Sequence, residues 1–242
     1  MEQIARTKTG IAGFDKLIEG GFPSGSTILL SGSPATGKTI LGLNFLYNGA
    51  VTFEEPGLYI SYEETKENII KTAKQFDWDF DRLLADKKIL IKTFQKEPLV
   101  LDTIIADIKR QIKGYGIKRI VIDSLTTLNF RRNAEEADRE QHLSEETKVK
   151  KFIFGLMDGL SEFKDATKIM ISEVEGDDER KLASESVSPF LCDGIIFIKY
   201  RTMGGAYSRE LVVRKMRHTN NKTGFYPMEI TKKGIAVKEQ GF

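Results

Sequence analysis

The chain has 242 residues, 40% of them hydrophobic, which is enough apolar material for the continuous core of one domain spanning residues 1–242. Its 37 basic and 35 acidic residues leave a formal net charge of +2, too small to dictate a nucleic-acid or membrane partner. The single cysteine, Cys192, excludes an intramolecular disulfide and a cysteine-cluster metal site, and its apolar neighbours predict burial. No apolar run approaches the roughly 18 residues of a membrane span, and the polar start lacks a secretory h-region, so we expect a cytoplasmic protein.

The first half of the chain alternates short β-branched runs with amphipathic segments. This pattern predicts strands at 27–31, 58–62 and 119–123, and helices at 38–50, 65–76 and 101–112. Strand 119–123 is almost wholly apolar, as a central parallel strand buried on both faces requires. The last helix carries a stripe that can pack only against a sheet or another helix, formed by Leu101, Ile104, Ile105, Ile108 and Ile112.

The second half continues with a predicted helix at 152–163 and predicted strands at 167–172 and 193–200. After residue 200 the pattern changes to short strands joined by turns, at 208–218, 224–231 and 234–239. We therefore expect an α/β fold with a mostly parallel central sheet flanked by helices and with C-terminal antiparallel strands at one edge. Two segments, 130–147 and 173–189, are typical of long loops.

A phosphate-binding motif lies between the first predicted strand and the first predicted helix. The segment "GSPATGKT" matches G-x-x-x-x-G-K-[ST] in the strand–loop–helix context that the motif requires. Its glycines let the loop turn its amides inward, the lysine neutralises the β and γ oxygens of a nucleotide, and the threonine offers a hydroxyl to Mg²⁺. The predicted nucleotide-binding residues are Gly32, Ser33, Pro34, Ala35, Thr36, Gly37, Lys38 and Thr39, followed by Ile40.

Acidic residues follow two of the predicted parallel strands. Asp123 ends strand 119–123 in the position of a Walker B aspartate, which holds Mg²⁺ directly or through water. Glu63 and Glu64 follow strand 58–62, on the side of the sheet where ligands bind in open α/β folds. The pair can orient and deprotonate a water molecule beside the γ-phosphate. From the residues alone, a solvated helix start is the more common interpretation of such a pair, since acids favour a first helical turn.

The segments from "TGIAGFDKLIEGGFPSG" through "RIVIDSLTTL" to "KMRHTNNKTGFYPMEITKKGI" resemble the KaiC family of RecA-like P-loop ATPases, specifically its single-domain archaeal members. The resemblance covers nearly the whole chain. It implies a RecA-like fold, binding of ATP and Mg²⁺, and a catalytic role for Glu63 and Glu64. It also implies that a Lys-x-Arg pair, Lys215 and Arg217, reaches the site of the neighbouring subunit in a homo-oligomeric ring, most simply a hexamer. Further nucleotide contacts implied by the resemblance are Met216, Thr219 and Thr231.

The chain also departs from that family. The founding clock protein carries two such domains, whereas this chain has room for one. Pro189 and Phe190 occupy the positions of the adjacent phosphorylated Ser/Thr pair, so phosphorylation there is chemically excluded. Asn221 replaces a histidine and Lys232 an aspartate near the base, which leaves ATP as the expected nucleotide but weakens the prediction of base preference.

Two other classes of function compete with an ATPase that drives a conformational or signalling change. A RecA/RadA-like recombinase or helicase needs basic loops to neutralise a nucleic-acid backbone. Segment 173–189 instead has six acids against two bases, and 130–147 has six acids against three arginines. A non-hydrolysing nucleotide sensor or scaffold would have no need for the paired acids Glu63 and Glu64. The sequence therefore favours an ATPase, with an unknown protein partner still open and a nucleic-acid partner disfavoured.

Overall fold

A computed structural model describes residues 4–94, 100–126, 144–174, 191–203 and 206–239. The strands are β1 Arg6–Thr7, β2 Phe22–Pro23, β3 Thr27–Gly32, β4 Gly57–Ser61, β5 Ile89–Thr93, β6 Arg119–Asp123, β7 Thr167–Glu173, β8 Gly194–Met203, β9 Ala206–Met216, β10 Tyr226–Thr231 and β11 Gly234–Val237. The helices are η1 Asp15–Leu17, a 3-10 turn, with α1 Lys38–Thr52, α2 Lys66–Lys74, α3 Phe80–Ala85, α4 Leu101–Tyr115 and α6 Glu145–Ser161.

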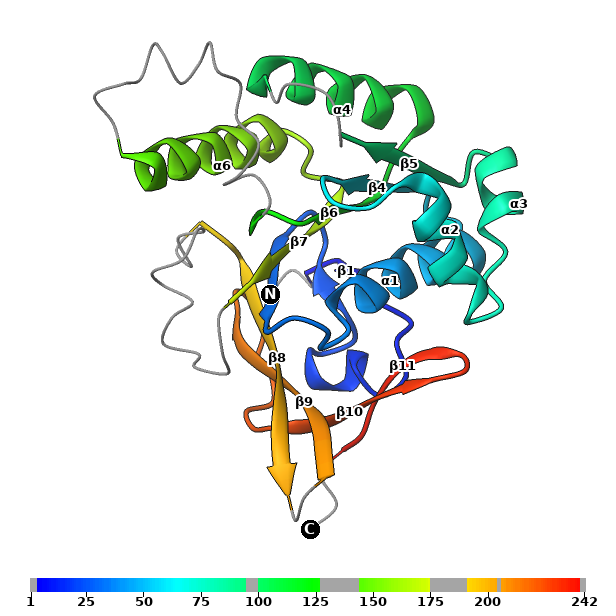
Figure 1. Ribbon diagram of the computed structural model, residues 1–242, viewed down its shortest axis with the longest axis vertical. Helices are drawn as coiled ribbons and strands as arrows, with labels where there is room; N and C mark the ends of the chain where they lie inside the picture. The colour runs from blue at the N-terminus through cyan, green and yellow to red at the C-terminus, as the bar shows by residue number, and fades with distance from the viewer. Residues whose placement is uncertain (1–3, 95–99, 127–143, 175–190, 204–205, 240–242) are drawn as a thin grey trace.

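A nine-stranded sheet organises the described part of the chain, with strand order β11-β10-β9-β8-β3-β7-β6-β4-β5 (Figure 1). The strands from β8 to β5 pair in parallel, whereas β9, β10 and β11 are antiparallel additions beyond β8. Strands β1 and β2 form a separate two-stranded sheet. The expected mostly parallel sheet with antiparallel C-terminal strands at one edge is therefore confirmed.

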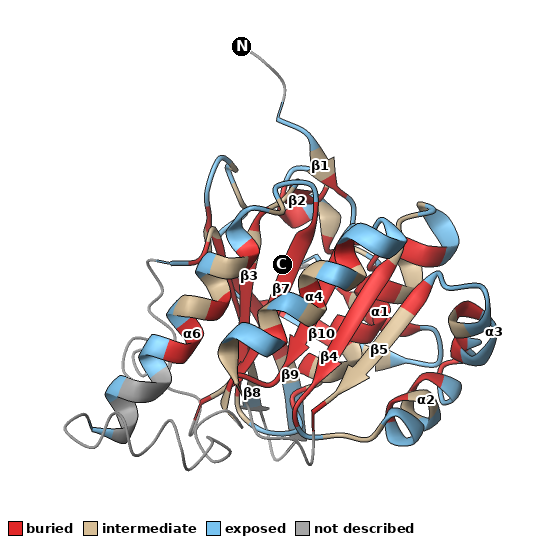
Figure 2. Ribbon diagram, turned by 90° about the horizontal axis from the view of Figure 1, so that it is seen from above, coloured by how far each residue is buried: buried red, intermediate tan, exposed pale blue. Residues whose placement is uncertain are grey.

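Helices cover both faces of the sheet, and alternate residues of the strands serve the two layers. In β3, Ile28 and Leu30 pack into the cluster that contains α1, α2 and α3, whereas Leu29 packs into the cluster that contains α4 and α6. Figure 1 shows β4, β6 and β7 between these helical layers, and Figure 2 shows α4 and α6 lying over the buried strands. Every residue of β6 is buried, as its apolar sequence predicts for a central parallel strand.

The apolar stripe of α4 packs against α6, as its helical spacing predicts. Two glycines of α6 allow the close approach: a Cβ atom at Gly155 would lie 2.5 Å from Leu101, and one at Gly159 would lie 2.7 Å from Ile105. Buried Ile108 lies in the same cluster. The two helices thus form one apolar layer over the sheet.

The predicted bounds of α6 are wrong at its N-terminus. The helix begins at Glu145 and not at residue 152, so residues 145–147 are helical rather than part of a loop. The Ser144 side chain caps it by accepting a hydrogen bond from the Thr147 backbone N–H at 3.3 Å. Polar residues fill these first turns and conceal the apolar period. Glu173 ends β7, while the rest of both predicted loops, 130–143 and 174–189, lies outside the described residues apart from Val174.

Single residues explain two further local features. Thr65 caps α2 by accepting a hydrogen bond from the Asn68 backbone N–H, a common role for threonine at a helix start. Cys192 is fully buried, as its apolar surroundings predict. Within the described ranges, no helix is both long and apolar enough to cross a membrane.

Candidate active site

The loop between β3 and α1 requires glycine at its start. Gly32 has a φ angle of 155°, and a Cβ atom there would lie 2.1 Å from the carbonyl oxygen of Ile198 on the adjacent β8. Gly37, with a φ angle of 102°, precedes the first residue of α1. The Thr36 hydroxyl closes the loop by donating to the carbonyl oxygen of Ser33 at 2.9 Å. A loop of this kind at a helix N-terminus directs backbone N–H groups toward an anion.

Lys38 is buried at the base of this loop. Its Nζ donates to the carbonyl oxygens of Gly32 at 3.0 Å and Ser33 at 2.9 Å. The same nitrogen lies 3.3 Å from the carboxylate of Glu173 at the end of β7. Burial lowers the pKa of Lys38, and the negative charge of Glu173 opposes that shift. The structure therefore holds the amine against the first two residues of the phosphate-binding loop and beside the Glu173 carboxylate.

Two hydroxyl groups bind Asp123 at the end of β6. Thr39 Oγ1 donates to its Oδ2 at 2.7 Å, and the buried Tyr59 hydroxyl donates to the same oxygen at 2.6 Å. Burial raises the pKa of Asp123 to about 6, against the effect of the two hydroxyl groups, and the charges of Glu63 and Glu64 add to the rise. The Walker B residue Asp123 and Thr39 of the phosphate-binding motif thus share one small polar site.

Glu63 and Glu64 follow β4 in a turn held by a serine. Ser61 Oγ accepts the backbone N–H groups of Glu63 at 3.2 Å and Glu64 at 2.8 Å. The Glu63 carboxylate accepts a hydrogen bond from the Ser124 hydroxyl at 2.7 Å, which joins it to the end of β6. Glu64 is half-buried, and burial followed by the charge of Glu63 raises the pKa of its carboxyl. Of the two acids, Glu64 therefore has the environment that favours accepting a proton.

The donor set at Thr39 and Asp123 fits Mg²⁺. The described residues contain no group of three or more His, Cys, Asp or Glu side chains able to hold a metal by themselves. Mg²⁺ commonly takes only one or two protein ligands and completes its shell with phosphate oxygens and water. A hydroxyl and a carboxylate 2.7 Å apart, beside a phosphate-binding loop, match that requirement.

The Lys-x-Arg segment lies where the parallel strands begin, whereas the phosphate-binding loop follows the carboxyl end of β3. Met216 of β9 pairs with Gly194 at the start of β8, whereas Gly32, where the phosphate-binding loop begins, pairs with Ile198. Four residues of strand separate the two levels, about 13 Å. The structure therefore does not bring the segment to the phosphate-binding loop of its own chain.

Both charged residues of this segment contact the chain just before β8. Lys215 Nζ donates to the carbonyl oxygen of Cys192 at 2.6 Å, and Arg217 NH1 lies 3.2 Å from Oδ1 of Asp193. Met216 between them is buried in the core, so only its backbone can face a ligand. Lys215 and Arg217 thus contact the same short segment, residues 192–193.

Of the remaining predicted nucleotide contacts, Ile40 directly follows Thr39 in α1, and Thr231 follows Ile230, whose side chain packs beside Gly37. Thr219 accepts a hydrogen bond from Arg6 NH1 at 2.6 Å, near the Lys-x-Arg segment. Thr231 ends β10 and donates to the carbonyl oxygen of Gly234 at 2.9 Å, in a hairpin that packs beside α1. Ile40 is partly buried against the core beneath α1. The contacts given for Thr219, Thr231 and Ile40 do not include Lys38 or Asp123.

A family model for KaiC ATPases matches residues 7–241. This chain belongs to the KaiC ATPase family. It is 32% identical over 238 residues to the circadian clock oscillator protein KaiC of Synechococcus elongatus, a match that covers 98% of this chain and 44% of that protein. The chain thus spans less than half of the length of this cyanobacterial KaiC relative.

Archaeal KaiC relatives match over more of their own length. A UPF0273 protein from Sulfurisphaera tokodaii is 32% identical over 241 residues, covering 98% of this chain and 83% of that protein. The crystal structure of a KaiC-like protein from Pyrococcus horikoshii superposes with a TM-score of 0.84 at 33% identity, covering 98% of this chain and 100% of that one. The resemblance to archaeal KaiC-like proteins with a RecA-like fold is confirmed.

The structure of this KaiC-family chain adds residues that the sequence does not single out. Glu173 contacts Lys38, Tyr59 contacts Asp123, and Ser124 contacts Glu63. The Tyr200 hydroxyl of β8 donates to the carbonyl oxygen of Ala35 in the loop at 2.6 Å. The position of Glu173 could have pointed to it, because a polar residue at the carboxyl end of a parallel strand lies where ligands of open α/β sheets bind.

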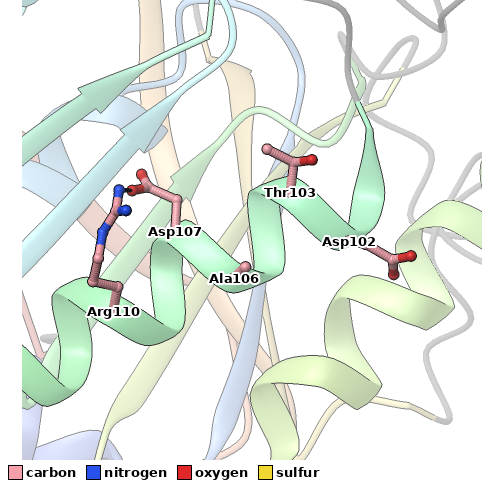
Figure 3. A pocket seen from close by; sticks show the side chains of 5 residues that line it. All are labelled: Asp102, Thr103, Ala106, Asp107 and Arg110. Atoms are coloured by element: carbon pink, nitrogen blue, oxygen red, sulfur yellow. Dashed lines mark hydrogen bonds and ion pairs between the residues drawn. The ribbon is translucent and has the colours of Figure 1, made fainter.

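A hollow of about 400 Å³ over α4 is separate from this site (Figure 3). Its lining comes from one helix: Asp102, Thr103, Ala106, Asp107 and Arg110. Asp107 pairs with Arg110 and, at 3.3 Å, with Lys92 of β5. The hollow shares no lining residue with the phosphate-binding loop.

Proposed function

We propose that this KaiC-family chain is a Mg²⁺-dependent ATPase that hydrolyses ATP at the subunit interfaces of a homo-oligomeric ring, most simply a hexamer. Hydrolysis drives a conformational or signalling change. We further propose that residues 1–242 form a single ATPase domain that works in the cytoplasm, with other copies of itself as its first partner.

One observation carries the proposal: the carboxyl edge of the parallel strands gathers a buried lysine, a threonine–aspartate pair and two glutamates. Lys38 and Thr39 follow β3, Asp123 ends β6, and Glu63 and Glu64 follow β4. Contacts between side chains join the ends of β4 and β6 to each other and β6 to α1. A nucleotide sensor needs only the lysine and the threonine–aspartate pair, whereas an enzyme that activates water needs the two glutamates as well.

Each group has a role in phosphoryl transfer. Lys38 and the loop amides bind the β and γ oxygens, and Glu63 and Glu64 orient the attacking water. As the bond from the water oxygen to the γ-phosphorus forms and the bond to the β–γ bridging oxygen breaks, Glu64 accepts the water proton. Its raised pKa favours this transfer. Glu63, bound to the Ser124 hydroxyl, keeps the pair against the end of β6.

Bound Mg²⁺ would neutralise charge on the β and γ oxygens, with Thr39 and Asp123 as its protein ligands, directly or through water. The hydrogen bonds from Thr39 and Tyr59 keep the Asp123 carboxylate oriented. Thr39 and Asp123 would therefore hold the metal ion, and Glu63 and Glu64 would act on the attacking water.

The position of the basic residues supports the proposed assembly. Lys215 and Arg217 flank Met216, which lies about 13 Å along the strands from the level of its own phosphate-binding loop, toward the ends where the parallel strands begin. A cation that stabilises transition-state charge must approach within contact distance of the phosphates. The pair therefore acts on the ATP of a neighbouring copy, in a head-to-tail arrangement that closes into a ring.

The test measures ATPase rate and molecular mass on the same sample, with and without Mg²⁺ and single-stranded DNA. The proposal predicts Mg²⁺-dependent turnover, a ring-sized mass with ATP, and a rate indifferent to DNA. Strong stimulation by DNA would favour the recombinase or helicase alternative. ATP binding without any turnover would favour the sensor.

A further inference from the structure

Asp193 is tied to the arginine of the Lys-x-Arg pair by both its backbone and its side chain. Its carbonyl oxygen accepts the Arg217 backbone N–H at 2.8 Å, and its Oδ1 lies 3.2 Å from Arg217 NH1. Its other oxygen, Oδ2, accepts the Thr27 backbone N–H at 2.9 Å, where β3 begins. One aspartate thus joins the end of β9 to the strand that leads into the phosphate-binding loop.

The residue before it contacts the lysine of the pair. The carbonyl oxygen of Cys192 accepts a hydrogen bond from Lys215 Nζ at 2.6 Å, and the Cys192 side chain is fully buried. Segment 192–193 therefore contacts both charged side chains of the pair and is itself anchored in the core and on β3.

We propose that Asp193 is a positioning residue that holds Arg217 in the orientation in which it meets the triphosphate of the neighbouring subunit. This inference rests on the proposed function, because it requires Arg217 to act in trans. A guanidinium is planar, so a contact at one of its nitrogens fixes the direction of the whole group. The contact reduces the number of rotamers that this half-exposed side chain samples, so less free energy is needed to order it at the phosphate.

Asp193→Asn separates this role from a role in the fold. The amide oxygen of asparagine can still accept the Thr27 N–H, whereas its NH₂ group cannot pair with a guanidinium. We expect the kcat for ATP to fall about ten- to a hundred-fold, with KM and the melting temperature nearly unchanged. Asp193→Glu should recover part of the rate. Asp165→Asn is the control, because Asp165 is exposed and its ion pair with Lys118, at 3.8 Å, lies at the surface.

Mixed rings provide the decisive experiment. Subunits with Glu63→Gln and Glu64→Gln have an inactive pocket but an intact Asp193–Arg217 contact. Asp193→Asn subunits have an active pocket but an Arg217 that lacks this contact. In an equimolar mixture about a quarter of the interfaces join an active pocket to an intact Arg217, so the rate should exceed that of either variant alone. The same mixing with Lys215→Ala, Arg217→Ala subunits tests the trans assignment by itself.

The outcomes are distinguishable. Recovery with both mixtures supports the inference. Recovery with the Lys215→Ala, Arg217→Ala mixture but not with Asp193→Asn overturns the role of Asp193 and leaves the proposed function standing. No recovery with either mixture overturns the trans assignment and the inference with it. An Asp193→Asn rate equal to or above that of the unmodified protein also overturns the inference, since the carboxylate would then only weaken the charge of Arg217.

Discussion

The ammonium group of Lys38 lies 3.3 Å from the carboxylate of Glu173, so two anions compete for one buried cation when a nucleotide binds. Glu173 ends β7, the strand between the phosphate-binding strand β3 and the Walker B strand β6. Its charge stabilises the lysine in the nucleotide-free chain and repels an incoming phosphate.

We expect Glu173→Gln to bind ATP about ten-fold more tightly, which corresponds to about 1.4 kcal/mol. The amide keeps the shape of the side chain and removes the charge that opposes the phosphates. Nucleotide titration by calorimetry measures the change, with Glu162→Gln as the matched control, because Glu162 pairs with Lys109 at the protein surface. Weaker binding in Glu173→Gln would instead indicate that the carboxylate contributes to nucleotide or metal binding.

Lys38→Met should abolish measurable ATP binding while the chain stays folded. Methionine keeps most of the apolar stem and loses the donor to the carbonyl oxygens of Gly32 and Ser33 as well as the charge. Calorimetry and circular dichroism together test this. Retained ATP affinity in a folded variant would contradict the role of the lysine.

The acidic limb of the rate profile should depend on Glu64. Burial and then Glu63 raise its pKa, so its proton-accepting form is lost on acidification at a pH above that of an ordinary glutamate. The free energy of unfolding changes with pH in the opposite direction. Because the folded state binds the Glu64 proton more tightly than the unfolded state, the contribution of Glu64 to stability falls as pH rises from its ordinary pKa through the raised one. The measurement is kcat against pH at saturating ATP and Mg²⁺. An acidic limb that persists unchanged in residual activity of Glu64→Gln would assign it to another group.

Two helical glycines should respond in opposite ways to alanine. At Gly49 of α1 a Cβ atom would lie 2.4 Å from Arg119, a fully buried side chain held by Glu55, so Gly49→Ala should destabilise the fold by about 1–3 kcal/mol. At Gly114 of α4 the same atom meets nothing within 4 Å, so Gly114→Ala should stabilise by about 0.5–1 kcal/mol. Urea unfolding measures both. Equal effects would show that the helix propensity, and not the packing, decides.

Much of this fold is predictable because its apolar residues recur at regular helix or strand spacing. Ile104, Ile108 and Ile112 mark the buried face of α4, and the apolar run before Asp123 marks a strand buried on both faces. The phosphate-binding loop is predictable because its spacing carries its own physical requirements, such as the crowded position of Gly32.

The contacts that sequence reasoning missed depend on strand order. Glu173 meets Lys38 because β7 pairs with β3, and Asp193 meets Arg217 because β9 returns antiparallel along β8. Neither pairing follows from local periodicity, which reports only which residues face the core. The start of α6 was missed for a different reason, since the polar residues after its Ser144 cap show no apolar period.

The central claim is that Glu63 and Glu64 activate water beside a triphosphate bound by the loop that precedes Lys38. The most direct measurement compares ATP affinity and single-turnover hydrolysis in the Glu63→Gln, Glu64→Gln double variant with those of the unmodified protein. We predict that binding stays within about three-fold, while hydrolysis falls by about two orders of magnitude or more. Unchanged binding together with unchanged turnover would remove both acids from the chemistry and contradict the account.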